Sequence, residues 1–111
     1  MASLCEMKCR AIPSGTPPLD TDAANSLLGQ LDSGWALGAD GHSLHRAFSF
    51  TDFYRTIGFV NAVAWIANAE DHHPDLQVGY DYCRVEFSTH TVGGLSDNDF
   101  ICAARIDALE R

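Results

Sequence analysis

Residues 51–74 read TDFYRTIGFVNAVAWIANAEDHHP, and this stretch decides the fold. Its apolar side chains recur at spacings of three and four residues, which is typical of one face of an α-helix. The Thr51-Asp52 pair can cap the helix start, whereas Pro74 cannot continue a helix and disfavours helical geometry at the residue before it. The stretch therefore predicts a long helix that begins after this pair and ends around Asp71 or His72. Its apolar stripe comprises Phe53, Ile57, Val60, Ala64 and Ala67, widened by Phe59, Val63 and Ile66.

Strand patterns flank this helix on both sides. Before it, the Ala39-Asp40-Gly41 turn separates a short strand that opens at Trp35 from a second strand, because Asp-Gly tolerates positive φ. After it, apolar alternation continues on both sides of a turn near Asp81. We therefore predict two β-hairpins. The alternating residues are Leu44, Phe48 and Phe50, with Arg46 between them, in the first hairpin, and Leu76, Val78, Tyr80, Cys83, Val85, Phe87 and Thr89 in the second.

Two further helices and an N-terminal arm complete the chain. Asp20 can cap a helix that stops near Ser33-Gly34. Ser96, with Asp99 three residues later, resembles the capping box of a last helix. Residues 1–19 contain several prolines and no apolar periodicity, so we expect an irregular arm outside the core.

The predicted order of elements is α-β-β-α-β-β-α, in a single domain over residues 20–111. Two hairpins with interspersed helices indicate an α+β fold, with a four-stranded antiparallel sheet and helices packed on one face. Such a sheet has two edge strands, which favour pairing with another subunit. Trp35 and Trp65 are interpreted as core residues rather than as platforms for a ligand.

Composition excludes several classes of function. The chain has 111 residues and a formal net charge of −8, which repels nucleic-acid phosphate. Its apolar runs fall well short of the about 20 residues that a membrane helix needs, and its first residues form no apolar signal region. We therefore expect a cytoplasmic protein that binds neither nucleic acid nor a membrane.

The four cysteines are expected to be thiols in that compartment. Cys5 and Cys9 have a spacing that could begin a zinc site, but no second pair of ligands with finger-like spacing follows them. Cys83 and Cys102 stand among apolar residues and are interpreted as small core side chains. We predict no metal site.

Three histidines are the candidate catalytic residues. His72 and His73 close the long helix, and His90 ends the last strand. If these two ends meet, three imidazoles share one pocket, and imidazole both donates and accepts protons near neutral pH. Such a group suits a proton-coupled elimination. A polar helix terminus and a three-histidine zinc site are alternatives, although adjacent histidines seldom bind one metal. His42 and His45 are interpreted as surface residues.

The histidines stand in a longer pattern that resembles a known family. The stretch Glu70-Asp71-His72-His73-Pro74-Asp75-Leu76 is similar to the signature of the pterin-4a-carbinolamine dehydratases. Tyr80, Ser88-Thr89-His90, Gly93-Gly94-Leu95-Ser96 and Asp99 continue that signature at matching spacing. The segment from Asp99 to Asp107 and the N-terminal arm resemble a bacterial-type subfamily. The resemblance covers most of the chain.

The resemblance implies an α+β fold, assembly as a homodimer or homotetramer, and a reaction. That reaction removes water from 4a-hydroxytetrahydropterin and gives quinonoid dihydropterin, without a metal or redox cofactor. Tetrahydrobiopterin recycling then links the chain functionally to an aromatic amino acid hydroxylase. Some members of the family act instead as non-catalytic assembly or transcriptional-cofactor modules, and this remains the alternative.

The resemblance also implies roles for individual residues. His72 and His90 would transfer protons, and His73 would hold the substrate. Asp71, Ser88 and Thr89 would line the pterin pocket, and Asp99 would orient His90 or cap the last helix. Two positions depart from many relatives, which have Glu where this chain has Asn68 and Trp where it has Leu76. These departures bear on rate and substrate range more than on reaction class.

Overall fold

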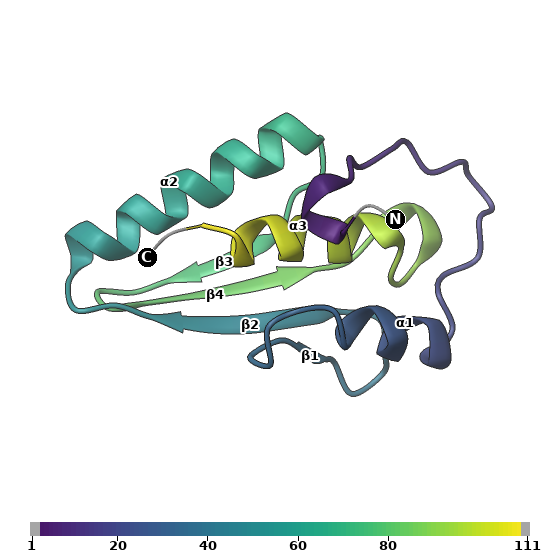
Figure 1. The fold of residues 1–111 in the computed structure, drawn as a ribbon, viewed down its shortest axis with the longest axis horizontal. Coiled ribbons are helices and arrows are strands. Elements are labelled where there is room, and N and C mark those ends of the chain that lie inside the picture. Colours follow the sequence, from purple (N-terminus) through teal and green to yellow (C-terminus); the bar gives the residue numbers. More distant parts are fainter. Residues whose placement is uncertain (1–2, 110–111) are drawn as a thin grey trace.

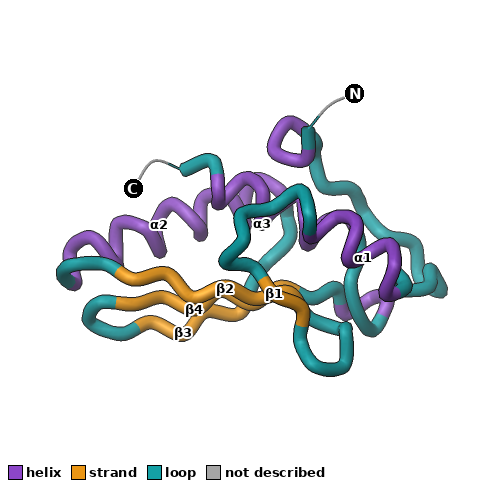
Figure 2. The backbone as a smooth tube through the Cα atoms, turned by 60° about the horizontal axis from the view of Figure 1, so that its bottom comes forward, coloured by secondary structure: helices purple, strands orange, loops and turns teal. Residues whose placement is uncertain are grey.

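The computed structural model describes residues 3–109 as one antiparallel sheet with helices on one of its faces (Figure 1). Figure 2 shows the helices on one side of the strands, with the other side of the sheet left open. Residues 1–2 of the predicted arm and 110–111 of the predicted domain lie outside the described residues. The elements are η1 (Leu4–Glu6), α1 (Thr21–Leu28), β1 (Ala36–Leu37), β2 (Leu44–Ser49), α2 (Phe53–Glu70), β3 (Asp75–Val78), β4 (Tyr82–Phe87), η2 (His90–Val92) and α3 (Asp97–Asp107).

The four strands have the order β1-β2-β4-β3, so the two hairpins meet along β2 and β4. These strands pair from Leu44 opposite Phe87 to Ser49 opposite Tyr82. Burial alternates strictly along β4, whose inward side chains are Cys83, Val85 and Phe87. The α+β fold class and the antiparallel hairpins predicted from the sequence are confirmed. No helix within residues 3–109 is long and apolar enough to cross a membrane.

Several predicted boundaries were wrong. Helix α1 ends at Leu28 rather than near residue 33, because the next residue is Gly29, and glycine costs about 1 kcal/mol in a helix interior. Strand β4 ends at Phe87, and His90 begins a short 3₁₀ turn instead of ending the strand. Trp65 is 72% exposed, since the buried stripe of α2 runs along another face of the helix.

The N-terminal arm packs on the domain and contributes one residue to the buried core. Leu4 belongs to the hydrophobic core and is 6% exposed. Further along, the guanidinium of Arg105 donates to the backbone carbonyl of Met7. The Asn98 side chain exchanges two hydrogen bonds with the backbone of Arg10, at 2.7 and 3.2 Å. The expectation of an arm outside the core is therefore wrong for Leu4. Side chains of α3 hold the irregular backbone at Met7 and Arg10.

Helix α3 is also anchored at its C-terminal end. The carboxylate of Asp107 accepts from Arg46 Nη1 and Trp35 Nε1, both at 2.8 Å. The Arg46 guanidinium lies 4.5 Å from the centre of the Phe48 ring. This cation–π contact stabilises a positive charge on the inner side of β2. These contacts fix α3 over the sheet.

Helix α2 ends at a residue with unusual backbone geometry. Asp71 has φ 52° and ψ 44°, in the left-handed region. It is the single non-glycine residue with positive φ within residues 3–109. The turn lets the backbone N–H of His72 donate to the Ala67 carbonyl at 3.1 Å. The direction in which His72 leaves the helix thus depends on Asp71.

The left-handed turn predicts opposite effects of two substitutions at Asp71. Asp71→Gly should maintain or raise the free energy of unfolding, because glycine adopts positive φ freely. Asp71→Val should lower it by about 1–2 kcal/mol, since a left-handed conformation is costly for a residue with a branched Cβ. Urea unfolding measures both effects.

Asp75 supplies the matched control, because it is an exposed residue of strand β3. A strand favours valine over glycine, so the order of the two variants should be reversed there. The same order at both positions would contradict the assigned geometry of Asp71.

Candidate active site

The centre of the candidate site is the buried carboxylate of Asp99, in the first turn of α3. Asp99 is 0% exposed, and its Oδ2 accepts the backbone N–H of Ser96 at 3.0 Å and the hydroxyl of Thr89 at 2.8 Å. The first of these bonds belongs to the capping box predicted for Ser96 and Asp99, which is confirmed. A buried carboxylate is costly without donors. Here the donors come from the helix start and from the segment that follows β4.

A third donor comes from His72, two residues beyond the end of α2. Its ring Nε2 lies 2.6 Å from Oδ1 of Asp99, and its side chain is 11% exposed. Because a carboxylate only accepts, this contact assigns the ring proton to Nε2. Nδ1 is then the ring nitrogen that remains for proton exchange with a ligand. We call this pair the Asp99–His72 dyad.

The floor beneath the dyad is aromatic. The His72 ring lies parallel to that of Phe87, with 5.9 Å between the ring centres and 8° between the planes. Phe87 is the last residue of β4 and is 1% exposed. Packing on this face and the hydrogen bond to Asp99 together hold the imidazole in one orientation.

Hydrogen bonds join three of the predicted site residues, namely His72, Thr89 and Asp99. The other predicted residues are their neighbours in the chain. Asp71 and His73, which flank His72, are exposed. Ser88, which precedes Thr89, is half-buried, and His90, which follows Thr89, is exposed at the start of η2.

Part of this arrangement was not predicted from the sequence. Asp99 was expected to orient His90 or to cap the last helix; it caps α3, and its oxygens contact His72, Thr89 and the Ser96 backbone rather than His90. Phe87 and the Ser96 hydroxyl, which lies 2.8 Å from the Thr89 hydroxyl, were predicted only as core and cap residues. The capping box was the available signal for Asp99, but no local pattern links it to a histidine 27 positions earlier.

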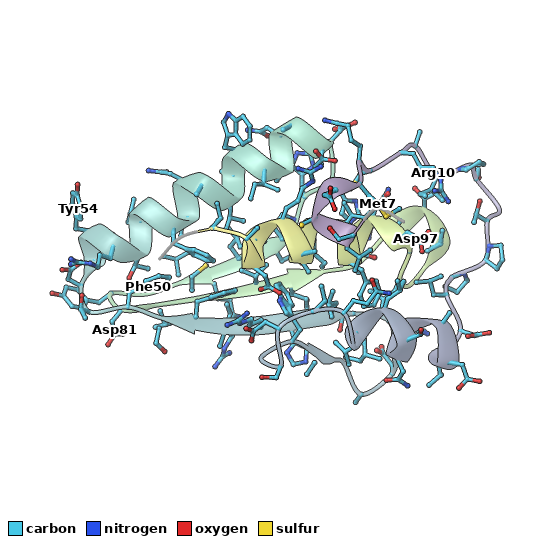
Figure 3. The ribbon with its side chains drawn as sticks, viewed as in Figure 1. Met7, Arg10, Phe50, Tyr54, Asp81 and Asp97 are labelled. Carbon is cyan, nitrogen blue, oxygen red and sulfur yellow. The ribbon has the colours of Figure 1, made fainter. Side chains whose placement is uncertain are left out.

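A second buried carboxylate, Glu70, ties the N-terminal arm to the end of α2. Its Oε1 accepts the backbone N–H of Cys9 at 2.8 Å, and its Oε2 lies 3.7 Å from both Lys8 Nζ and Arg105 Nε. Figure 3 shows Met7 and Arg10 where the arm crosses the start of α3, near Asp97. The arm therefore braces the helix end from which the histidine pair emerges.

The pKa of the Glu70 carboxyl is lowered, although two opposite effects act on it. Burial raises this pKa, because it disfavours the charged form. The hydrogen bond from Cys9 and the charges of Arg105 and Lys8 lower it and together outweigh burial. Glu70 therefore stabilises the folded state as an anion.

Residues that could hold a metal do not gather anywhere within residues 3–109: no three His, Cys, Asp or Glu side chains form a suitable group. Three surface hollows, of about 510, 300 and 460 Å³, are lined by residues other than His72, His73 and His90. The largest lies over β2, β3 and β4.

The lowered pKa predicts how Glu70→Gln changes stability with pH. At pH 7 this variant should lose about 1–3 kcal/mol of unfolding free energy, because an amide replaces the anion that Cys9, Lys8 and Arg105 surround. A carboxyl whose folded pKa is lowered stabilises the fold above its usual pKa of about 4.3 and loses that contribution as the pH falls further. The difference from wild type should therefore shrink below about pH 4.

Urea unfolding at a series of pH values measures this difference. Glu86→Gln is the control, since Glu86 is exposed and lies opposite Asp75 in the strand register. Removing one of two facing like charges should cost nothing at pH 7. A Glu70→Gln penalty that stayed constant down to pH 3 would disprove the anionic role.

Comparison with known proteins gives matches over most of the chain. The sequence model of the family described as pterin 4 alpha carbinolamine dehydratase matches residues 17–109. A protein of Nitrosomonas europaea, provisionally named pterin-4-alpha-carbinolamine dehydratase, is 53% identical over 98% of this chain and 97% of its own length. A protein of Legionella pneumophila with the same provisional name is 50% identical over 97% of this chain and 96% of its own. Both matches therefore include the N-terminal arm.

Solved structures share the fold. A crystal structure described as a transcriptional coactivator/pterin dehydratase from Brucella melitensis has a TM-score of 0.78 and 31% identity, and covers 82% of this chain and 96% of that one. A pterin dehydratase-like protein identified as a RuBisCO assembly factor in the alpha-carboxysome has a TM-score of 0.59 at 24% identity, which shows the fold alone. From the match over residues 17–109 and the near full-length relatives, this chain belongs to the pterin 4 alpha carbinolamine dehydratase family.

Proposed function

We propose that this protein dehydrates 4a-hydroxytetrahydropterin to quinonoid dihydropterin by histidine acid–base catalysis. Family membership supports the reaction class. The observation that carries the proposal is the Asp99–His72 dyad, a largely buried imidazole held 2.6 Å from a fully buried carboxylate. A positioned imidazole of this kind is suited to proton transfer near neutral pH.

The reaction needs one proton donor and one acceptor. The donor protonates the 4a-hydroxyl, the C4a–O bond breaks and water leaves. The acceptor removes a proton from a ring nitrogen, and the electrons of that N–H bond form the new C=N bond. His72 and His90 take these two roles in the proposal, and His73 holds the pterin ring. This dehydration needs neither a redox cofactor nor a metal.

The contact with Asp99 suits His72 to proton transfer. The carboxylate keeps one tautomer, so Nδ1 is available whenever the ring is neutral. The carboxylate also stabilises the imidazolium that forms when the ring accepts a proton, and it remains hydrogen-bonded to the ring during this step. Asp99 is thus a positioning residue, whereas Asp71, Ser88 and Thr89 are proposed to line the pterin pocket.

The wider role is proposed on the same basis. Recycling of tetrahydrobiopterin in the cytoplasm would link the protein to an aromatic amino acid hydroxylase, which consumes the regenerated cofactor. A homodimer or homotetramer fits the two edge strands β1 and β3. Asn68, which is exposed, and Leu76, which is half-buried, stand where many relatives have Glu and Trp, and they bear on rate and substrate range.

Substitution of the histidines tests the proposal. His72→Ala and His90→Ala should each lower the dehydration rate, corrected for the spontaneous reaction, by about 10²–10⁴-fold. Asp99→Asn should lower kcat by about 10²-fold with little change in KM, because it misplaces His72 without removing a substrate contact. Stopped-flow absorbance of the pterin measures these rates.

His45→Ala is the matched control, since His45 is exposed on β2 and should leave the rate unchanged. Circular dichroism must show that each variant is folded, because Asp99 also caps α3. A wild-type rate equal to the spontaneous rate would refute the enzymatic function.

The relative described as a transcriptional coactivator/pterin dehydratase favours one alternative, a binding module with the same fold. Titration with a stable pterin analogue distinguishes the enzyme from the binding module. Saturable binding that is lost in His73→Ala supports the enzyme. No binding by the folded wild-type protein, together with a specific protein partner, supports the module.

A further inference from the structure

The docked N-terminal arm brings two thiols into contact. The Sγ atoms of Cys9, in the arm, and Cys102, in α3, lie 3.5 Å apart, although the residues are separated by 93 positions in the chain. Cys102 is fully buried, whereas Cys9 is half-buried at the surface of the domain. Cys5 is exposed and Cys83 is buried within β4. The proposed dehydration uses none of these thiols.

The contact between the two thiols is held from several directions. The Cys9 backbone N–H is bound by Glu70, and the thiol of Cys9 donates to the Asn98 carbonyl at 3.6 Å. On either side, Met7 and Arg10 are fixed by Arg105 and Asn98. Six backbone and side-chain contacts over residues 7–10 therefore maintain the position of Cys9 opposite Cys102.

We propose that Cys9 and Cys102 form an oxidisable dithiol, a modification site at which a peroxide converts the two thiols into a disulfide that fastens the arm to α3. Neither thiol is hydrogen-bonded to the Asp99–His72 dyad, so this proposal does not rest on the proposed dehydration.

The chemistry requires one equivalent of peroxide. Cys9 loses its proton to solvent, and its thiolate attacks one peroxide oxygen, so that an S–O bond forms and the O–O bond breaks. Cys9 becomes a sulfenic acid and the peroxide is reduced to water. The Cys102 sulfur then attacks the Cys9 sulfur, the S–O bond breaks, and hydroxide leaves with the Cys102 proton as a second water. A small-molecule thiol reverses the product by exchange.

The environments of the two thiols set the order of these steps. The hydrogen bond with Cys9, burial, and the negative charges of Glu70 and Asp99 all raise the pKa of the Cys102 thiol. Cys102 therefore stays protonated and inaccessible, and Cys9 is the thiol that meets the oxidant first.

The fold can accommodate the new bond. The sulfurs must approach from 3.5 Å to the disulfide length of about 2.05 Å. Because Cys9 lies in a segment without regular secondary structure, we expect the arm rather than α3 to move when the bond forms. The disulfide would close a loop through almost the whole domain, which favours a large stabilisation.

Peroxide treatment of the purified, reduced protein tests the site. Hydrogen peroxide should lower the intact mass by about 2 Da, the mass of two hydrogens, and dithiothreitol should reverse the change. Peptide mapping after alkylation should recover a Cys9–Cys102 linked peptide. The melting temperature of the oxidised protein should rise by at least about 5 °C.

Two variants make the result specific. Cys5→Ser should behave as wild type, because Cys5 is exposed and is not part of the pair. Cys9→Ser should give no loss of 2 hydrogens, and Cys102 should still be alkylated after unfolding. A linked peptide containing Cys5, or oxidation of Cys9 to sulfinic acid without any linked peptide, would overturn the proposal.

Discussion

The hydrogen-bonded carboxylate of Asp99 is the interaction on which the rest of the structure depends. It is fully buried and accepts from His72, Thr89 and the Ser96 backbone. These donors follow α2, follow β4 and precede α3, so one anion joins three segments that are distant in the sequence. Loss of one of these donors would strongly destabilise the folded state, because the buried carboxylate would then lack one of its hydrogen-bond partners. Stability and the orientation of a candidate catalytic imidazole therefore rest on the same group.

The remaining contacts direct these segments toward that carboxylate. The left-handed turn at Asp71 sets the exit of His72 from α2, and Glu70 attaches the same helix end to the arm. Asp107 fixes the other end of α3 through Arg46 and Trp35. Because α3 is held at both ends, the Asp99–His72 dyad stands on a rigid support, which favours precise positioning in a catalytic site.

Much of the fold could be predicted from local patterns. The 3.6-residue periodicity of α2, the alternation along β4 and the Ser96 capping box are each encoded within one element. Other features could not, because they depend on tertiary contacts. Nothing near Asp99 in the sequence indicates His72 as its partner, and nothing in the proline-rich arm indicates that Leu4 enters the core. Trp65 was wrongly assigned to the core, since hydrophobicity alone does not show which helix face meets the sheet. The histidine roles came from resemblance rather than from periodicity.

The proposed function requires that the imidazoles of His72, His73 and His90 share one pterin site. Histidine ring NMR signals, followed during titration with a stable pterin analogue, test it most directly. We expect the signals of these three residues to shift together along one saturation curve, while His45, exposed on the sheet, does not respond. Saturable shifts of His72 and His73 with no response from His90 would contradict it.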